Sequence, residues 1–344
     1  MRIPIFLTLS ALVTSANAAT YEVVFANEAT FSTPGLGLTP GARYSLNTVT
    51  ASGDKAYGFV QERDGGGIVE YDKSTDSFRT VTDHATWVAA AGDDLFASNG
   101  AVVAGSELVF SNFITNSVYS INIASGAVTT RVTSGTLDAL TGGSVNLSAA
   151  NSFNTDGSGF FYDGQSDSIL GTDASGNASI SVSSLQLTTL AGNDSVNAIA
   201  AAGNIIYYGS NTSDSLYSWN TTTGTGALLL NTAQIESVTD DIDGRAGFNG
   251  ALVGPDGLLY FYETDADYIL SVDPNDANPA STLAVARSEV DLNDGPAGSD
   301  LVSQITWFDG ELAWKERNGF SVVPEPSSAL LTSLAALALM RRRR

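Results

Sequence analysis

Short runs of β-branched and aromatic residues alternate with polar turns along the chain from Tyr21 to Val323. Glycine, asparagine, aspartate, serine and threonine separate these runs, and this pattern is typical of strands joined by tight turns. No long amphipathic helix interrupts the pattern. The sequence therefore predicts an all-β body.

One run recurs at a nearly constant interval. It ends in Asp or Asn and continues through a polar turn into another strand. The copies end, 50, 51, 47 and 53 residues apart, at Asp72, Asn122, Asp173, Asn220 and Asp273. A sixth copy, Gly319–Val323, has Pro324 where the Asp or Asn would stand. A period near fifty residues is that of a four-stranded β-propeller blade.

Each copy is expected to be the third strand of its unit. The second strands are predicted at Lys55–Val60, Glu107–Phe113, Gly159–Tyr162, Asn204–Tyr208, Leu258–Glu263 and Glu311–Glu316. Turns such as Asp156-Gly157 and Asp256-Gly257 precede them and suit tight hairpins. The Asp and Asn residues that end the third strands are expected to cap the following turns, because their side chains bond the backbone two residues on.

The two ends of the body complement each other. The sixth unit supplies only three strands, and the chain begins with an unpaired strand at Tyr21–Ala26. Pairing that strand with the last unit would remove an open edge that otherwise favours aggregation. The sequence therefore predicts a six-bladed β-propeller closed by the N-terminal strand, spanning residues 19–323. A row of sheets without ring closure is the alternative.

The first eighteen residues have the three parts of a secretory signal peptide in order. Arg2 precedes an apolar run from Ile3 to Val13, and Ala16-Asn17-Ala18 is a small-residue cleavage site. We expect cleavage after Ala18. A buried N-terminal core segment is the alternative.

The last twenty-one residues, 324–344, form a second addressing segment. Pro324-Glu325-Pro326 is followed by the apolar stretch Ala329–Met340 and then by Arg341, Arg342, Arg343 and Arg344. Twelve to fourteen helical residues at about 1.5 Å each fall short of a ~30 Å bilayer core, which suits a transient stop with its arginines in the cytoplasm. A plain membrane tail with an accidental Pro-Glu-Pro is the alternative.

This segment resembles the PEP-CTERM sorting signal. The resemblance implies a protein exported by a Gram-negative bacterium, processed by an exosortase, and released to the cell surface or into exopolysaccharide. It implies contact with the export machinery and, before processing, membrane contact through the C-terminal transmembrane helix. The resemblance covers these last residues and none of the repeat body.

Composition excludes several chemistries. The chain has no cysteine, which removes disulfides and thiolate metal sites, and its single histidine, His84, cannot form a multi-histidine centre. The net charge of −22 argues against nucleic acid, which needs clustered Lys and Arg. Without Arg2 and the four terminal arginines, but with Glu325 kept, ten basic residues face 37 acidic ones, a net charge of −27. Such a body suits solubility and attracts divalent cations.

Long polar linkers join successive units, at 83–100, 133–143, 183–194, 231–245 and 287–300. They are expected to share one rim with the turns between second and third strands, which would be the rim for a ligand. Two linkers are dense in oxygen ligands that could bind Ca²⁺, namely Asp240, Asp241 and Asp243, and Asp291, Asn293 and Asp294. Neither has EF-hand spacing, so ordinary solvated loops are the alternative.

The sequence favours a non-enzymatic binding or matrix protein at the cell surface or in exopolysaccharide, with polysaccharide as a possible partner. The alternative is a secreted polysaccharide hydrolase or lyase that uses rim carboxylates such as Glu62 and Asp64, since paired carboxylates cleave glycosides. No nucleophile elbow or phosphate-binding loop is present.

Overall fold

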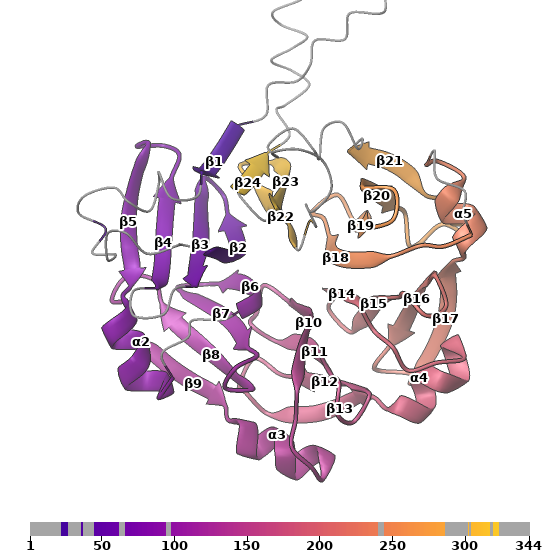
Figure 1. Cartoon of the computed structure of the whole chain (residues 1–344), viewed down its shortest axis with the longest axis horizontal. Coiled ribbons are helices and arrows are strands. Elements are labelled where there is room, and N and C mark those ends of the chain that lie inside the picture. Colours follow the sequence, from indigo (N-terminus) through magenta and orange to yellow (C-terminus); the bar gives the residue numbers. More distant parts are fainter. Residues whose placement is uncertain are drawn as a thin grey trace, which may run out of the picture.

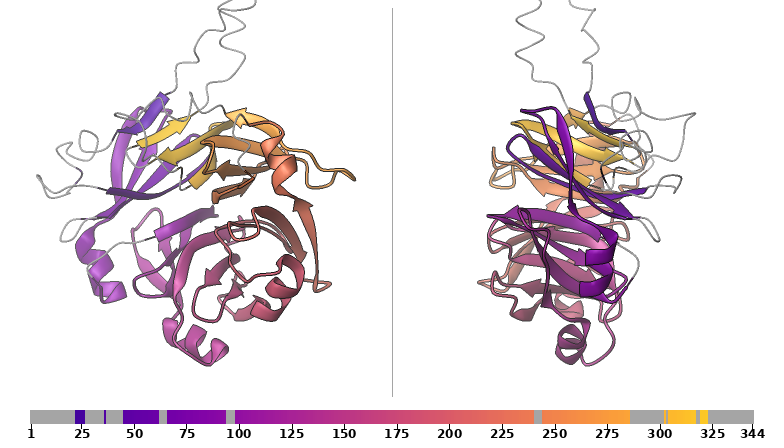
Figure 2. Two further views of the ribbon diagram at one scale, coloured as in Figure 1. Left: turned by 45° about the vertical axis from the view of Figure 1, so that its right-hand side comes forward. Right: turned by 90° about the vertical axis from the view of Figure 1, so that its left-hand side faces the viewer.

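A computed structural model describes residues 22–26, 36, 45–61, 66–93, 98–239, 244–285, 302, 304–316 and 319–322. Within them the chain forms four-stranded antiparallel sheets that surround a central axis as the blades of a β-propeller (Figure 1). The predicted all-β propeller is confirmed. The right-hand view of Figure 2 shows the same ring nearly edge-on, with the strands crossing its thickness.

Five blades are each built from four consecutive strands, with the first strand innermost. Blade 1 comprises β2 (Ser45–Ser52), β3 (Lys55–Gln61), β4 (Gly67–Asp72) and β5 (Ser77–Thr82). Blade 2 comprises β6 (Ser98–Ala104), β7 (Glu107–Asn112), β8 (Ser117–Asn122) and β9 (Val128–Val132). Blade 3 comprises β10 (Leu147–Phe153), β11 (Gly159–Asp163), β12 (Ser168–Thr172) and β13 (Ala178–Val182).

The other two continuous blades follow the same order. Blade 4 comprises β14 (Ala198–Ala202), β15 (Ile205–Ser210), β16 (Ser215–Asn220) and β17 (Thr225–Leu230). Blade 5 comprises β18 (Phe248–Val253), β19 (Leu259–Glu263), β20 (Tyr268–Val272) and β21 (Thr282–Val285). The second and third strands lie within two residues of their predicted ends.

The remaining sheet joins the two ends of the chain. It contains β22 (Gln304–Phe308), β23 (Glu311–Glu316), β24 (Gly319–Val322) and, at its outer edge, β1 (Glu22–Ala26). β1 pairs antiparallel with β24, with Glu22 opposite Val322, so the predicted pairing of the N-terminal strand is confirmed. We call this the closing sheet. Its inner strand β22 contacts β18 on one side and β2 on the other.

Short helices occupy the linkers that the sequence analysis treated as loops. They are α2 (His84–Ala91), α3 (Ser134–Thr141), α4 (Ser184–Ala191) and α5 (Thr232–Glu236). Each follows a capping residue that accepts a hydrogen bond from the helix backbone, namely Asp83, Thr133, Ser183 and Asn231. Helices of eight residues or fewer are too short to show a 3.6-residue period, which is why the pattern concealed them.

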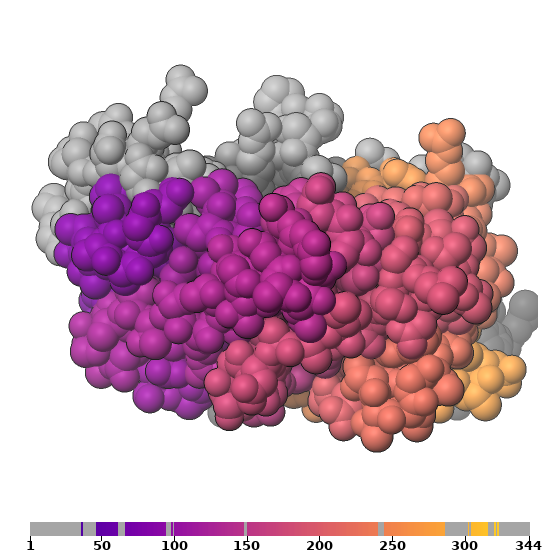
Figure 3. Space-filling model, turned by 90° about the horizontal axis from the view of Figure 1, so that it is seen from below, coloured from indigo at the N-terminus to yellow at the C-terminus, as the bar shows by residue number. Residues whose placement is uncertain are grey.

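The core consists of apolar layers between neighbouring blades. Between blades 1 and 2, for example, Phe59 and Phe110 meet edge-to-face at 5.1 Å, and Trp87 of α2 packs 4.9 Å from Tyr119. From the side the molecule presents a continuous packed surface in which the blades follow one another in chain order (Figure 3). Because each layer needs both of its blades, the blades stabilise one another.

The two predicted addressing segments lie outside the described residues. This applies to the predicted cleavage site at Ala16 and Ala18 and to residues 324–344. No helix in the described part of the chain is long and apolar enough to cross a membrane.

Candidate functional site

The propeller has two different rims. The turns between first and second strands, and between third and fourth, form what we call the turn rim. The inter-blade connections with α2–α5, and the turns between second and third strands, form the linker rim. Neighbouring strands of a blade run antiparallel, so the order of strands places these two sets of turns on opposite faces.

A cavity of about 510 Å³ occupies the centre of the ring. The first strands of all five blades and of the closing sheet line it. Its lining also includes four residues from the turns that follow β10 and β18, namely Asn154, Thr155, Gly254 and Pro255. The cavity therefore opens at the turn rim. The sequence predicts a ligand at the linker rim, whereas this cavity opens at the opposite rim.

One position of the ring differs sharply between the blades. The residue that pairs with the second residue of the second strand is, in order, Ala51, Val103, Ser152, Ala201, Leu252 and Trp307. Five of these side chains are small or aliphatic, and the sixth is a partly exposed tryptophan that lines the cavity. The approximate symmetry of the ring is therefore broken at the closing sheet.

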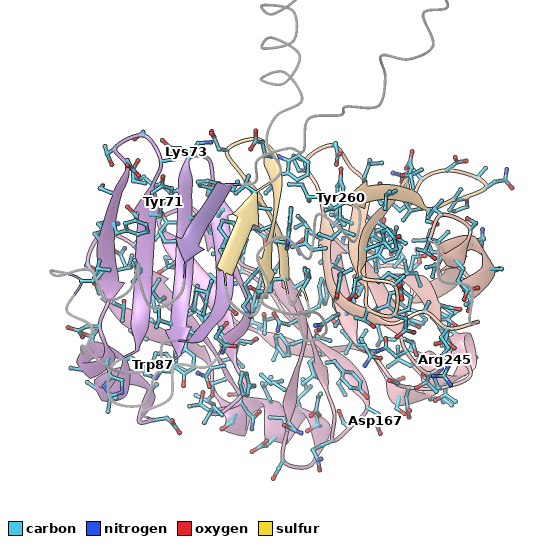
Figure 4. The ribbon with its side chains drawn as sticks, turned by 45° about the horizontal axis from the view of Figure 1, so that its top comes forward. Tyr71, Lys73, Trp87, Asp167, Arg245 and Tyr260 are labelled. Carbon is cyan, nitrogen blue, oxygen red and sulfur yellow. The ribbon has the colours of Figure 1, made fainter. Side chains whose placement is uncertain are left out.

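Trp307 is supported from blade 5. Its ring centroid lies 5.7 Å from that of Tyr260, on the side of blade 5 that faces the closing sheet (Figure 4). The Tyr260 hydroxyl donates a hydrogen bond of 2.7 Å to Asp256 Oδ2 in the adjacent turn. Burial, followed by this bond, raises the pKa of Tyr260 above its usual range. Tyr260 is thus a neutral donor anchored behind the tryptophan.

A hydrogen-bond network joins the closing sheet to blade 1 and blade 1 to blade 2. Gln304 Oε1 accepts from Val49 N at 2.7 Å, and Gln304 Nε2 donates to Thr48 Oγ1 at 3.2 Å. Thr48 Oγ1 in turn donates to the carbonyl oxygen of Ser98 in blade 2. These amide and hydroxyl groups join three sheets without using any charge.

The cavity has an uncharged lining. None of the described residues that line it carries an ionisable side chain. The polar groups are amides and hydroxyls, and they include Thr50, Asn151, Asn249, Gln304 and Thr306. Acid–base catalysis needs a titratable group within hydrogen-bond reach, and none of these described lining residues supplies one.

A smaller cavity of about 300 Å³ lies on the linker rim between blades 4 and 5. Asp214, Arg245 and Asp265 line it, and Figure 4 shows Arg245 at this side of the molecule. The six calcium candidates, Asp240, Asp241, Asp243, Asp291, Asn293 and Asp294, all lie outside the described residues, as do Glu62 and Asp64. Among the residues that are described, no group of three or more His, Asp or Glu side chains could hold a metal ion.

The buried charged groups are found within the sheets. Glu70 accepts hydrogen bonds from Arg79 Nε at 2.9 Å and from Lys55 Nζ at 3.1 Å on blade 1. Burial opposes its ionisation, but these two cations outweigh burial and lower the pKa of Glu70. In the closing sheet, burial lowers the pKa of Lys315 to about 8.

Sequence reasoning did not find Trp307. The sequence does contain a cue to this residue. When the repeat units are aligned on the turn before each second strand, Trp307 falls at the position that Ala51 and Ala201 occupy in blades 1 and 4. The sequence pattern indicates only a part of the first strand of blade 1, Thr48–Ala51, and the strand β2 that contains it spans Ser45–Ser52. The register of β2 against β3 shifts between Leu46 and Thr48, and such a bulge breaks the alternation that marks a strand.

No protein-family model matches the sequence, and no curated protein does. Among solved structures, a structural-genomics protein of unknown function from Bacteroides thetaiotaomicron superposes with a TM-score of 0.56 and 14% identity, covering 88% of this chain and 74% of that one. A luciferin-regenerating enzyme has a TM-score of 0.52 at 11% identity and covers 89% and 96%. A streptogramin B lyase has a TM-score of 0.52 at 13% identity and covers 88% and 96%. At this level of identity the likeness shows the fold alone, and one fold supports many activities.

Proposed function

We propose that this chain is an exported propeller that binds a ligand at the cell surface or in exopolysaccharide, without transforming it, and that a PEP-CTERM signal sorts it there. The uncharged central cavity is the observation that carries the binding part of the proposal. The enzymatic alternative, a secreted hydrolase or lyase that uses carboxylates as glycosidases do, would need such groups at its site, and the described lining of the central cavity supplies none.

The export part rests on the two addressing segments of the sequence. The fold is compatible with their removal, because β1 begins at Glu22, after Ala18, and β24 ends at Val322, before Pro324. Cleavage at either segment would leave every described strand in place. The segments would therefore act as addresses and the ring as the cargo.

Expression of the full-length chain in an exosortase-carrying Gram-negative host tests the export part. The intact mass and the cellular fraction of the product would be compared with those of a variant carrying Pro324→Ala, Glu325→Ala and Pro326→Ala. We expect the wild-type chain to lose its C-terminal segment and reach the surface or matrix fraction, and the variant to remain unprocessed. Identical processing of both chains would refute the sorting signal.

A reducing-sugar assay on the same protein tests the binding part against the enzymatic alternative. We expect no release of sugar from the host's polysaccharide. Release of sugar that one carboxylate substitution abolishes would overturn the non-enzymatic proposal.

A further inference from the structure

We infer that the central cavity binds a neutral saccharide, with one sugar ring stacked against Trp307. This inference rests on the proposed function, because it names the ligand class of the binding propeller. Three features support it: the exceptional tryptophan, polar side chains in the same cavity that make no hydrogen bond within the described part of the chain, and the distribution of charge.

Trp307 has the properties of a stacking platform. It is the one bulky aromatic at a ring position where the five blades have small or aliphatic side chains. Its neighbour Tyr260 is fixed by a hydrogen bond to Asp256, so the platform is held before a ligand arrives. Aromatic side chains offer large apolar area at small entropic cost, and the apolar face of a sugar ring can cover that area.

Polar groups elsewhere in the lining of the same cavity are free to bond a ligand. Thr306 and Asn249 line the cavity and are partly exposed, and their side chains make no hydrogen bond within the described part of the chain. A hydroxyl and a primary amide both donate and accept, as a sugar hydroxyl also does. Specificity in small-molecule sites comes from a few such groups set in a mainly apolar wall.

Charge selects a neutral ligand over an ionic one. A uronate or sulfated sugar would meet no cation among the described lining residues and would be repelled by a chain of net charge −22. An amino sugar would meet no carboxylate in the lining, so its ammonium group would be desolvated without a partner. An uncharged polyol avoids both costs. The cavity volume of about 510 Å³ lies within the usual range for small-molecule sites.

A glycan array tests the ligand class with the purified, processed chain. The array would carry neutral, uronic-acid and amino-sugar oligosaccharides. We expect binding to neutral glycans, and an affinity loss of about tenfold or more for Trp307→Ala, with most affinity restored in Trp307→Tyr. Trp219→Phe is the matched control, because Trp219 is buried in blade 4 and is 5% exposed; it should bind as the wild-type chain does.

Tryptophan fluorescence provides a second readout that does not depend on the array. Of the four tryptophans, Trp87, Trp219 and Trp314 are buried, at 0%, 5% and 0% exposure, and only Trp307 is partly exposed. A neutral glycan that binds should therefore protect the wild-type chain from acrylamide quenching and leave the quenching of Trp307→Phe unchanged.

The outcomes separate this inference from the proposed function. Glycan binding that survives Trp307→Ala, or a preference for acidic glycans, would overturn the cavity assignment and leave a binding propeller. A silent array would overturn the saccharide inference, even if the exported protein still fractionates with the matrix. If the wild-type chain neither binds the array nor fractionates with the matrix, the saccharide inference and the proposed function are both overturned.

Discussion

Asp and Asn side chains at the ends of the third strands explain the period of the sequence. Asp72 Oδ1 accepts from Ser74 N at 3.0 Å, and Asn122 Oδ1 accepts from Ala124 N at 3.1 Å. The same bond recurs at Asp173, Asn220 and Asp273. The expectation that these residues cap turns is confirmed. Their recurrence is therefore explained by the repeated turn of the blades and does not indicate a binding site.

A second recurrent residue at this scale was not singled out from the sequence. The residue before the third strand has positive φ at Asn116 (49°), Asp167 (47°), Asp214 (49°) and Asp267 (61°). Asn and Asp tolerate this left-handed conformation better than other residues with a side chain. Each closes the turn between second and third strands, and Asp167 also accepts a hydrogen bond of 2.9 Å from the Tyr162 hydroxyl.

Tyr208 and Tyr217 make a matched pair for testing buried hydroxyls. Their rings stack at 5.2 Å, but the Tyr208 hydroxyl has no partner among the described residues, whereas the Tyr217 hydroxyl bonds Ser213 Oγ at 3.0 Å. We expect Tyr208→Phe to leave the free energy of unfolding unchanged or raise it by up to about 1 kcal/mol, and Tyr217→Phe to lower it by about 1 kcal/mol. Urea denaturation measures both free energies. A greater loss of stability for Tyr208→Phe than for Tyr217→Phe would contradict the conclusion that only the Tyr217 hydroxyl forms a stabilising hydrogen bond.

The Glu70 cluster predicts a specific pH dependence. The pKa of Glu70 is lowered in the fold, so the stabilisation from its ion pairs is present above the unfolded pKa, near 4.5, and is lost as the pH falls through the folded value. We expect Glu70→Gln to lower the free energy of unfolding by roughly 1–3 kcal/mol at pH 7.

The difference between the wild-type chain and Glu70→Gln should shrink as the pH falls from 5 to 3. Denaturant titrations of both proteins across this range isolate the effect from the other acidic residues, because those are common to both. A difference that stays constant with pH would contradict the ion-pair explanation.

At the scale of elements, the linker helices depend on their caps. In α4, Ser183 and Gln186 form a reciprocal capping box, and Gly192 ends the helix at a φ of 74°. Leu187 buries the inner face at 1% exposure, next to the core between blades 3 and 4. One buried leucine provides little amphipathic signal, so the cues to α4 in the sequence were its capping box and the glycine at its end.

Removing the cap of α4 should cost stability. We expect Ser183→Ala to lower the free energy of unfolding by about 1 kcal/mol, since it leaves helix N–H groups without a partner. Thr188→Ala, at an exposed position of the same helix, is the control and should change stability by less than about 0.5 kcal/mol. Equal effects of the two substitutions, measured by thermal denaturation, would show that the cap does not stabilise the fold.

The molecule as a whole is held closed at the contact between blade 1 and the closing sheet. Besides the Gln304 network, Lys73 Nζ lies 2.6 Å from Asp309 Oδ2 and 5.7 Å from the centroid of the Phe308 ring, and Asp309 N donates to Gly53 O at 2.7 Å. Figure 4 shows Lys73 at this end of blade 1. Because β1 is the outer strand of the closing sheet, the N-terminal and C-terminal strands of the ring hold each other in place.

Disrupting β1 should weaken the whole ring. We expect Val23→Pro, opposite Ser321 in the pairing of β1 with β24, to lower the free energy of unfolding by roughly 2–3 kcal/mol and to increase aggregation, because it removes a backbone donor and exposes an edge. Val23→Thr, which retains the backbone donor and a β-branched side chain, is the control. Thermal denaturation with light scattering measures both effects, and equal behaviour of the two variants would refute the role of β1.

The sequence by itself determined the all-β class, the period near fifty residues and the second and third strands, because alternation and turn residues are local signals. It also contains both addressing segments, which remain predictions. Only the tertiary structure decided at which rim the central cavity opens, that its described lining is uncharged, and that Trp307 occupies a position where the five blades have small or aliphatic side chains. These properties arise where first strands from distant parts of the chain come together around one axis, and a local sequence pattern does not show which distant residues will be neighbours.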